Sequence, residues 1–192
     1  MPTQNLYPNA AGDLTQFATV EPSSINHFQA VDETSADDDT SYIQSGTDEL
    51  SDGYFIVIKE NSTITEVQKG NSTSYVTYTH EFTTKPSDSS AFTVTDINNL
   101  QIGVNFTGPD NPTDQTDLFN IEDWPHNSAD TINSITVSAR YKDSQAASSL
   151  NKMRCTQVFV TVDYTAFVET TGPFKIEAGA KVKIESGKLT IK

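Results

Sequence analysis

Three histidines, His27, His80 and His126, are the side chains of this sequence best suited to acid–base or metal chemistry. Some 50 residues separate each from the next, and none has a second ligand at zinc-site spacing. The sequence also lacks a G-x-S-x-G elbow, a Gly-rich phosphate loop and an H-E-x-x-H motif. We therefore expect no enzymatic activity, no bound metal and no other cofactor.

Acidic residues form clusters whose carboxylate oxygens could bind calcium. No D-x-D-x-D-G loop organises these clusters, and acidic runs within Ser/Thr-rich loops are usually solvated. A solvated surface is the favoured interpretation, and a calcium site is the alternative. The acids concerned are Asp32, Glu33, Asp37, Asp38, Asp39, Asp110, Asp114 and Asp117.

Trp124, the only tryptophan, lies in the segment Trp124-Pro125-His126 and could form a stacking platform for a sugar. A lone Trp before Pro is more often the anchor of a loop. We retain Trp124 as a possible ligand platform. A carbohydrate-binding or adhesive surface module is accordingly the alternative function.

Composition excludes several classes of protein for this chain of 192 residues and net charge −14. Nucleic-acid binders carry a clustered basic surface, which residues 1–170 do not show, so we expect no direct nucleic-acid partner. The longest apolar runs are a handful of residues, so we expect no membrane span. With Cys155 as the only cysteine, an apolar core must hold the fold, and we expect a buried or half-buried, unreactive thiol.

The elements that must position these residues are strands, because apolar and polar residues alternate repeatedly along the chain. Short alternating segments between turn residues predict an all-β fold, an antiparallel β-sandwich with a jelly-roll-like arrangement. One short helix is expected at 93–99, and loops at 108–114 and 143–151. The predicted strands are 30–32, 42–44, 54–59, 63–69, 75–80, 100–105, 135–140 and 156–164. The expected core includes Val76, Tyr78, Ile102, Val104, Ile135, Val137, Val158, Val160 and Val162.

The charge changes sign near the C-terminus, which divides the chain into a module 1–169, a linker 170–173 and a ribbon 174–192. The ribbon holds five Lys and two Glu, so residues 1–173 carry a net charge of −17. Either it pairs with an edge of its own domain, or it adds strands to another chain or begins a stalk. Its expected partner-binding residues are Phe174, Lys175, Ile176, Lys181, Val182, Lys183, Ile184, Lys188, Leu189 and Ile191.

A set of short blocks spans nearly all of residues 5–165: 7–9, 31–33, 37–43, 74–75, 82–86, 92–93, 96–97, 100–104, 154–160 and 162–164. Together these blocks resemble a family of small virion proteins of tailed phages and related prokaryotic viruses. One further block, 130–140 preceded by 117–123, follows the acidic opening directly in such proteins, whereas here it comes after 100–104. The ribbon 174–192 lies outside the resemblance.

The resemblance implies a β-sandwich that serves on a virus head, tail or fibre and has no enzymatic activity. It further implies that the protein is located in the virion. The expected partners are other virion proteins, such as capsid, portal, tail or fibre subunits, and further copies of the chain itself. An acidic surface rich in Thr, Ser and Asn is consistent with exposure on a particle, because it repels packaged DNA.

Overall fold

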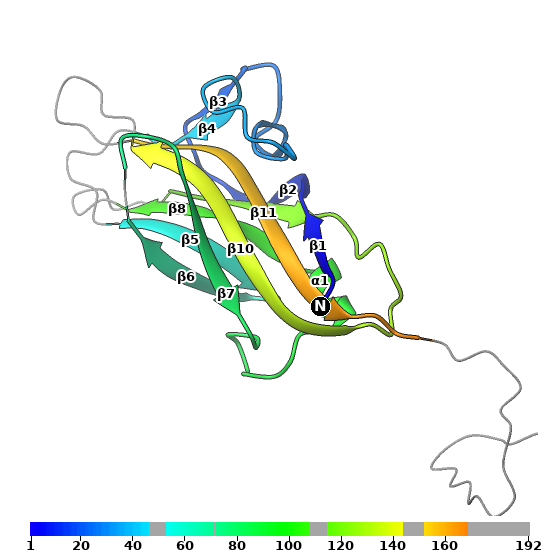
Figure 1. The fold of residues 1–192 in the computed structure, drawn as a ribbon. Coiled ribbons are helices and arrows are strands. Elements are labelled where there is room, and N and C mark those ends of the chain that lie inside the picture. The colour runs from blue at the N-terminus through cyan, green and yellow to red at the C-terminus, as the bar shows by residue number, and fades with distance from the viewer. Residues whose placement is uncertain (47–52, 71, 108–114, 144–151, 169–192) are drawn as a thin grey trace, which may run out of the picture.

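A computed structural model describes residues 1–46, 53–70, 72–107, 115–143 and 152–168, which form two antiparallel β-sheets packed as a sandwich (Figure 1). The predicted all-β antiparallel fold is confirmed, and its jelly-roll connectivity stays a prediction. The predicted loop 108–114, most of the loop 143–151, the linker 170–173 and the ribbon 174–192 lie outside the described residues.

The first sheet is built around its two longest strands, β10 and β11, which bend at register shifts in their pairing. Its strand order is β3-β4-β11-β10-β7, and β1 also pairs with β11. The strands are β1 (Thr3–Leu6), β3 (Thr19–Glu21), β4 (Tyr42–Gln44), β7 (Val76–Phe82), β10 (Thr131–Asp143) and β11 (Met153–Thr165).

Three N-terminal segments share the edge of β11 that faces away from β10. Strand β1 pairs with residues 160–163, and β4 pairs with residues 154–155. Between them, the Val158 N–H donates to the Val31 carbonyl at 2.9 Å. The beginning of the chain therefore completes the pairing of the last described strand, and the N-terminus lies beside the end of β11 (Figure 1).

The second sheet has the order β2-β9-β8-β5-β6. Strands β8 and β9 approach so closely at Gly103 that a Cβ there would collide with the Asp117 carbonyl oxygen. Glycine is therefore required at position 103. The strands are β2 (Pro8–Thr15), β5 (Gly53–Glu60), β6 (Thr63–Lys69), β8 (Gln101–Thr107) and β9 (Gln115–Ile121).

The predicted helix is present as α1 (Val94–Asn98), and Thr93 is its N-cap. The Asp96 N–H donates to Thr93 Oγ1 and the Thr93 N–H donates to Asp96 Oδ2, so two amides that a helix start leaves unpaired are both satisfied. Among the described residues, no helix has the length and apolar character of a membrane span.

The predicted strand at 30–32 is wrong, because its first residue belongs to the 3₁₀ helix η1 (Phe28–Ala30). The chain coils there because the N–H groups of residues 29, 30 and 31 donate to the carbonyls of residues 26, 27 and 28, the three-residue spacing of a 3₁₀ helix. Ala30 and Val31 are nevertheless fully buried, so their apolar character reflects packing rather than strand pairing.

The core between the sheets contains seven of the nine expected residues, all essentially inaccessible to solvent: Ile102, Val104, Ile135, Val137, Val158, Val160 and Val162. Cys155 is buried as expected. Tyr78 is half-buried and packs against the core. The prediction for Val76 is wrong, because its side chain is 38% exposed at the start of the edge strand β7.

Candidate functional site

Trp124 is a buried loop anchor with only 7% of its surface exposed. Its backbone N–H donates to Asn98 Oδ1 at 2.8 Å, and its Nε1 donates to Asp130 Oδ2 at 3.1 Å. Tyr164 and His126 each pack edge-on against the indole, with ring centroids 4.9 and 5.2 Å away. Little of the ring is left for a ligand to stack upon, although His126 beside it is exposed.

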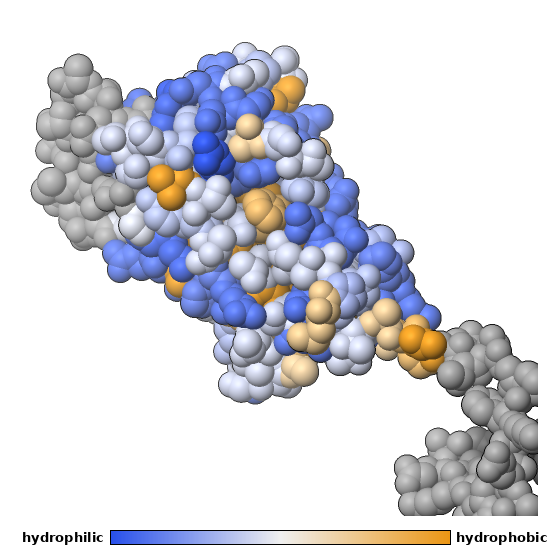
Figure 2. Space-filling view, viewed as in Figure 1, coloured by the Kyte–Doolittle hydropathy of each residue, from blue (hydrophilic) through white to orange (hydrophobic). Residues whose placement is uncertain are grey.

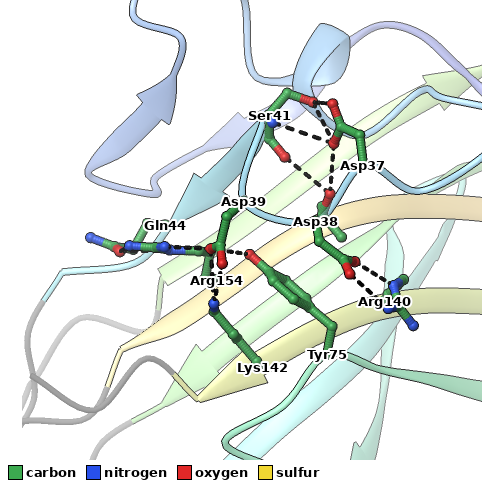
Figure 3. Close-up of polar contacts among 10 residues, drawn as sticks. Asp37, Asp38, Asp39, Ser41, Gln44, Tyr75, Arg140, Lys142 and Arg154 are labelled. Atoms are coloured by element: carbon green, nitrogen blue, oxygen red, sulfur yellow. Dashed lines mark hydrogen bonds and ion pairs between the residues drawn. The ribbon is translucent and has the colours of Figure 1, made fainter.

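The acidic run that suggested calcium lies on the outer face of the first sheet, where basic side chains of β10 and β11 meet it (Figure 3). Asp38 has a left-handed backbone, φ 55°, which directs consecutive carboxylates toward different partners. The two carboxylate oxygens of Asp38 accept hydrogen bonds from Arg140 Nε at 2.7 Å and from Arg140 Nη2 at 3.0 Å. This two-point contact fixes the guanidinium geometrically as well as electrostatically.

Asp39 is the centre of the cluster and accepts hydrogen bonds from three side chains. Lys142 Nζ lies 2.8 Å, Arg154 Nη1 2.7 Å and the Tyr75 hydroxyl 3.1 Å from Asp39 Oδ1. Lys142 and then Arg154 stabilise the charged carboxylate and lower its pKa from 3.8 to about 2. Burial and the neighbouring Asp39 charge raise the pKa of Tyr75, so this phenol stays protonated.

Lys142 and Arg154 also make cation–π contacts with aromatic rings. Lys142 Nζ lies 4.4 Å from the centroid of the Tyr75 ring, and the Arg154 guanidinium lies 4.0 Å from that of Tyr42. Arg154 also donates to Gln44 Oε1 at 2.9 Å. Each contact is a modest stabilisation at a partly exposed site, and together they hold β4 and the acidic run on the sheet.

Asp37 connects the same segment to β11 through hydroxyl groups. The Ser41 hydroxyl oxygen lies 3.1 Å from the Asp37 carboxylate and the Ser41 N–H donates to Asp37 Oδ1 at 3.3 Å, while Thr156 Oγ1 lies 3.2 Å from Asp37 Oδ1. Glu33 accepts from the Ser41 hydroxyl at 2.6 Å, and burial raises the pKa of its carboxyl. These acids are hydrogen-bonded within the protein rather than arranged around an open position.

The part of the chain that the structure describes contains no group of three or more His, Cys, Asp or Glu side chains that could hold a metal ion. Asp110 and Asp114 lie outside the described residues. Asp38 instead pairs with Arg140, and Asp39 pairs with Lys142 and Arg154. These ion pairs can hold the acidic run 37–39 against the first sheet, and the basic side chains neutralise most of its negative charge.

The prediction that Asp117 belongs to a solvated acidic surface is wrong, because its carboxylate is fully buried. Its Oδ1 accepts from the backbone N–H groups of Gln16 at 2.6 Å and Phe17 at 2.9 Å. Its Oδ2 lies 2.5 Å from His27 Nδ1. The alternation of Asp117 with Phe119 and Ile121, both buried, is the sequence signal that places it on the inner face.

The ribbon residues predicted to bind a partner, Phe174 to Ile191, lie outside the described residues. Just before them, Phe167 and Val168 are 50% and 74% exposed, although both are apolar. Elsewhere the visible outer face of the first sheet is mostly hydrophilic, and apolar colour is confined to small separate areas (Figure 2). No protein-family model, no curated protein and no solved structure matches this chain.

Proposed function

We propose that this chain is a non-enzymatic structural subunit on the exterior of a virus particle, as a decoration, fibre or head–tail accessory protein. The observation that carries the proposal is that two of the family-like blocks, 37–43 and 154–160, contact each other. Asp39 pairs with Arg154 at 2.7 Å, and Thr156 Oγ1 donates to the Ser41 carbonyl at 3.0 Å. The resemblance therefore covers a packed framework, which supports a shared architectural role.

The proposed assembly device is the Lys-rich ribbon 174–192. Its net charge of +3 is opposite to that of residues 1–173, and its apolar residues alternate with lysines. The exposed apolar pair Phe167 and Val168 leads into it. Added strands provide backbone hydrogen bonds and apolar burial, whereas the lysines provide steering toward an acidic partner surface.

The test is incorporation of the chain into purified particles, measured by quantitative mass spectrometry. We expect a fixed copy number for the full chain and loss of incorporation on deletion of 174–192. Two ribbon variants separate the contributions: replacing Lys175, Lys181, Lys183 and Lys188 by Gln should make incorporation less salt-sensitive and weaker. Replacing Ile176, Val182, Ile184 and Leu189 by Ser should abolish it. Absence of the full chain from particles would contradict the proposed function.

The carbohydrate-binding alternative requires an aromatic face that a sugar can reach, and the burial of Trp124 does not favour it. The exposed ring at this place is His126, which stacks on Tyr164 with centroids 5.1 Å apart. Glycan-array binding by the full chain that His126→Ala abolishes, with an unchanged circular dichroism spectrum, would reverse the ranking of the two functions.

A further inference from the structure

Strand β7 ends the first sheet, and one of its edges is unpaired among the described residues. Along its other edge, Val76 to Phe82 pair with Tyr141 to Ile135 of β10 in an unbroken register. The sequence of β7, VTYTHEF, contains no Pro, Gly or Lys. Pro, charged side chains (Lys above all) and bulges are devices by which edge strands commonly prevent pairing with another chain, and of these β7 has only Glu81.

The other sheet ends differ from β7. Strand β2 contains Pro8 and Gly12, and its pairing with β9 shifts register twice. Strand β3 has only three residues. Strand β6 is regular but has Glu66 at its centre, where a two-fold pairing of two β6 strands would bring identical charges together.

Antiparallel pairing of β7 with its counterpart in a second copy can be arranged without bringing like charges together. A two-fold axis through the middle of the strand places Thr79 opposite Thr79, a favourable cross-strand pair. Glu81, the only acid of the strand, then lies opposite Thr77 rather than opposite another carboxylate. Both Thr77 and Thr79 are exposed in the single chain, so neither must leave a packed position.

Val76 supplies an independent reason for this pairing. It has the same parity along β7 as Tyr78, His80 and Phe82, which turn toward the interior, and yet it remains 38% exposed. In the two-fold register Val76 lies opposite Phe82 of the second copy. The pairing thus covers the one expected core residue that the single chain leaves in the exposed class.

We propose that β7 is a homotypic assembly edge, through which two copies pair antiparallel around Thr79 and join their first sheets into one continuous sheet. The inference goes beyond the proposed function, and it requires neither a virus particle nor the ribbon 174–192. A ladder of seven residues is small compared with a standard protein interface, so the dimer should be weak and concentration-dependent.

The first test is site-specific disulfide formation in the full chain. Thr79→Cys should give a disulfide-linked dimer under mild oxidation, because the two-fold register brings position 79 opposite itself. Thr77→Cys is the matched control on the same strand and face, and its two copies would lie about 13 Å apart. Cys155 is fully buried and does not compete. No dimer from Thr79→Cys, or equal yields from both variants, would overturn the proposal.

The second test measures the dimer by sedimentation equilibrium, with circular dichroism to verify the fold. Thr79→Lys places two like charges at the axis and should raise the dissociation constant at least about tenfold. Thr63→Lys, at an exposed position of β6, should leave it unchanged. Deletion of 174–192 should also leave the dimer intact. If that deletion abolishes the dimer, the ribbon is what pairs, and the β7 proposal is wrong.

Discussion

Replacing Asp117 tests how a buried carboxylate holds the N-terminal segment against the second sheet. Its Oδ1 takes both backbone hydrogen bonds, from Gln16 and Phe17, whereas Oδ2 faces only His27. This division predicts that Asn and Ala substitutions have very different effects. In Asp117→Asn, Oδ1 keeps the two backbone donors, and the new amide N–H group can donate to His27 Nδ1 when the ring carries its proton on Nε2.

We expect Asp117→Asn to lower the free energy of unfolding by about 1 kcal/mol, the difference between charged and neutral hydrogen bonds. Asp117→Ala leaves two backbone N–H groups of residues 16 and 17 without their acceptor in a largely buried place. At roughly 1–3 kcal/mol for each orphaned group, it should cost about 3–5 kcal/mol. Such a loss is a large part of the usual stability of a domain.

The assay is urea unfolding at pH 7, followed by tryptophan fluorescence, since Trp124 is buried and unique. His27→Ala is the control that removes the third hydrogen bond and leaves the backbone pair intact, so its loss should lie between those of Asp117→Asn and Asp117→Ala. Equal losses for Asn and Ala would show that charge rather than the Oδ1 acceptor matters. A loss below about 1 kcal/mol for Ala would refute the reasoning.

Three further predictions concern pH and packing. The pKa of Asp39 is lowered to about 2, so its stabilisation should be complete above about pH 4 and fall away as the pH drops toward 2. Asp39→Asn should weaken the pH dependence of the free energy of unfolding between about pH 2 and pH 4. An unchanged pH dependence would contradict the ion-pair role of Asp39. Burial raises the pKa of Cys155 to about 12, so thiol ionisation in the unfolded chain should reduce stability as the pH rises above about 9. Cys155→Ala should reduce the slope that begins near pH 9 in urea titrations, whereas the slope at higher pH from tyrosines with a raised pKa, such as Tyr75, should remain. An unchanged slope near pH 9 would contradict the role of Cys155. Gly103→Ala should cost several kcal/mol or prevent folding, whereas Gly70→Ala, whose Cβ would lie 3.7 Å from Tyr78, should not. Equal urea midpoints would show that β8 and β9 can separate freely.

Strands with a regular alternation were predictable from sequence, because alternation records which face is buried. Strand β6 begins and ends at the predicted residues, Thr63 and Lys69, and the predicted Tyr42–Gln44 is β4. Strands β1, β2 and β3 escaped prediction, since the first 21 residues contain Pro8 and Gly12 and few alternating apolar residues. They form strands because β11, β9 and β4 supply hydrogen-bond partners distant in sequence.

The acidic run illustrates what sequence cannot reveal about a site. From sequence alone, Asp38 and Asp39 are interpreted as solvated acids or calcium ligands, because their partners lie about 100 positions away on β10 and β11. Arg140, Lys142 and Arg154 alternate along the outer face of those strands, but no local pattern indicates which acids they meet. Trp124 was placed more successfully, because the preference of a Trp–Pro pair for anchoring a loop is local information.

The sharing of β11 among distant segments has a consequence for how the chain acquires its structure. Strand β11 ends at Thr165 and lies between β10 and the three N-terminal segments that contain β1, Val31 and β4. During synthesis these N-terminal residues leave the ribosome before β11, which follows them by more than 100 residues, and they cannot form their native pairs until it emerges. The first sheet can therefore close only after nearly all of the described residues have been synthesised, so its folding should be slow. Until then the segments that pair with β11 remain exposed to non-native pairing, which favours aggregation.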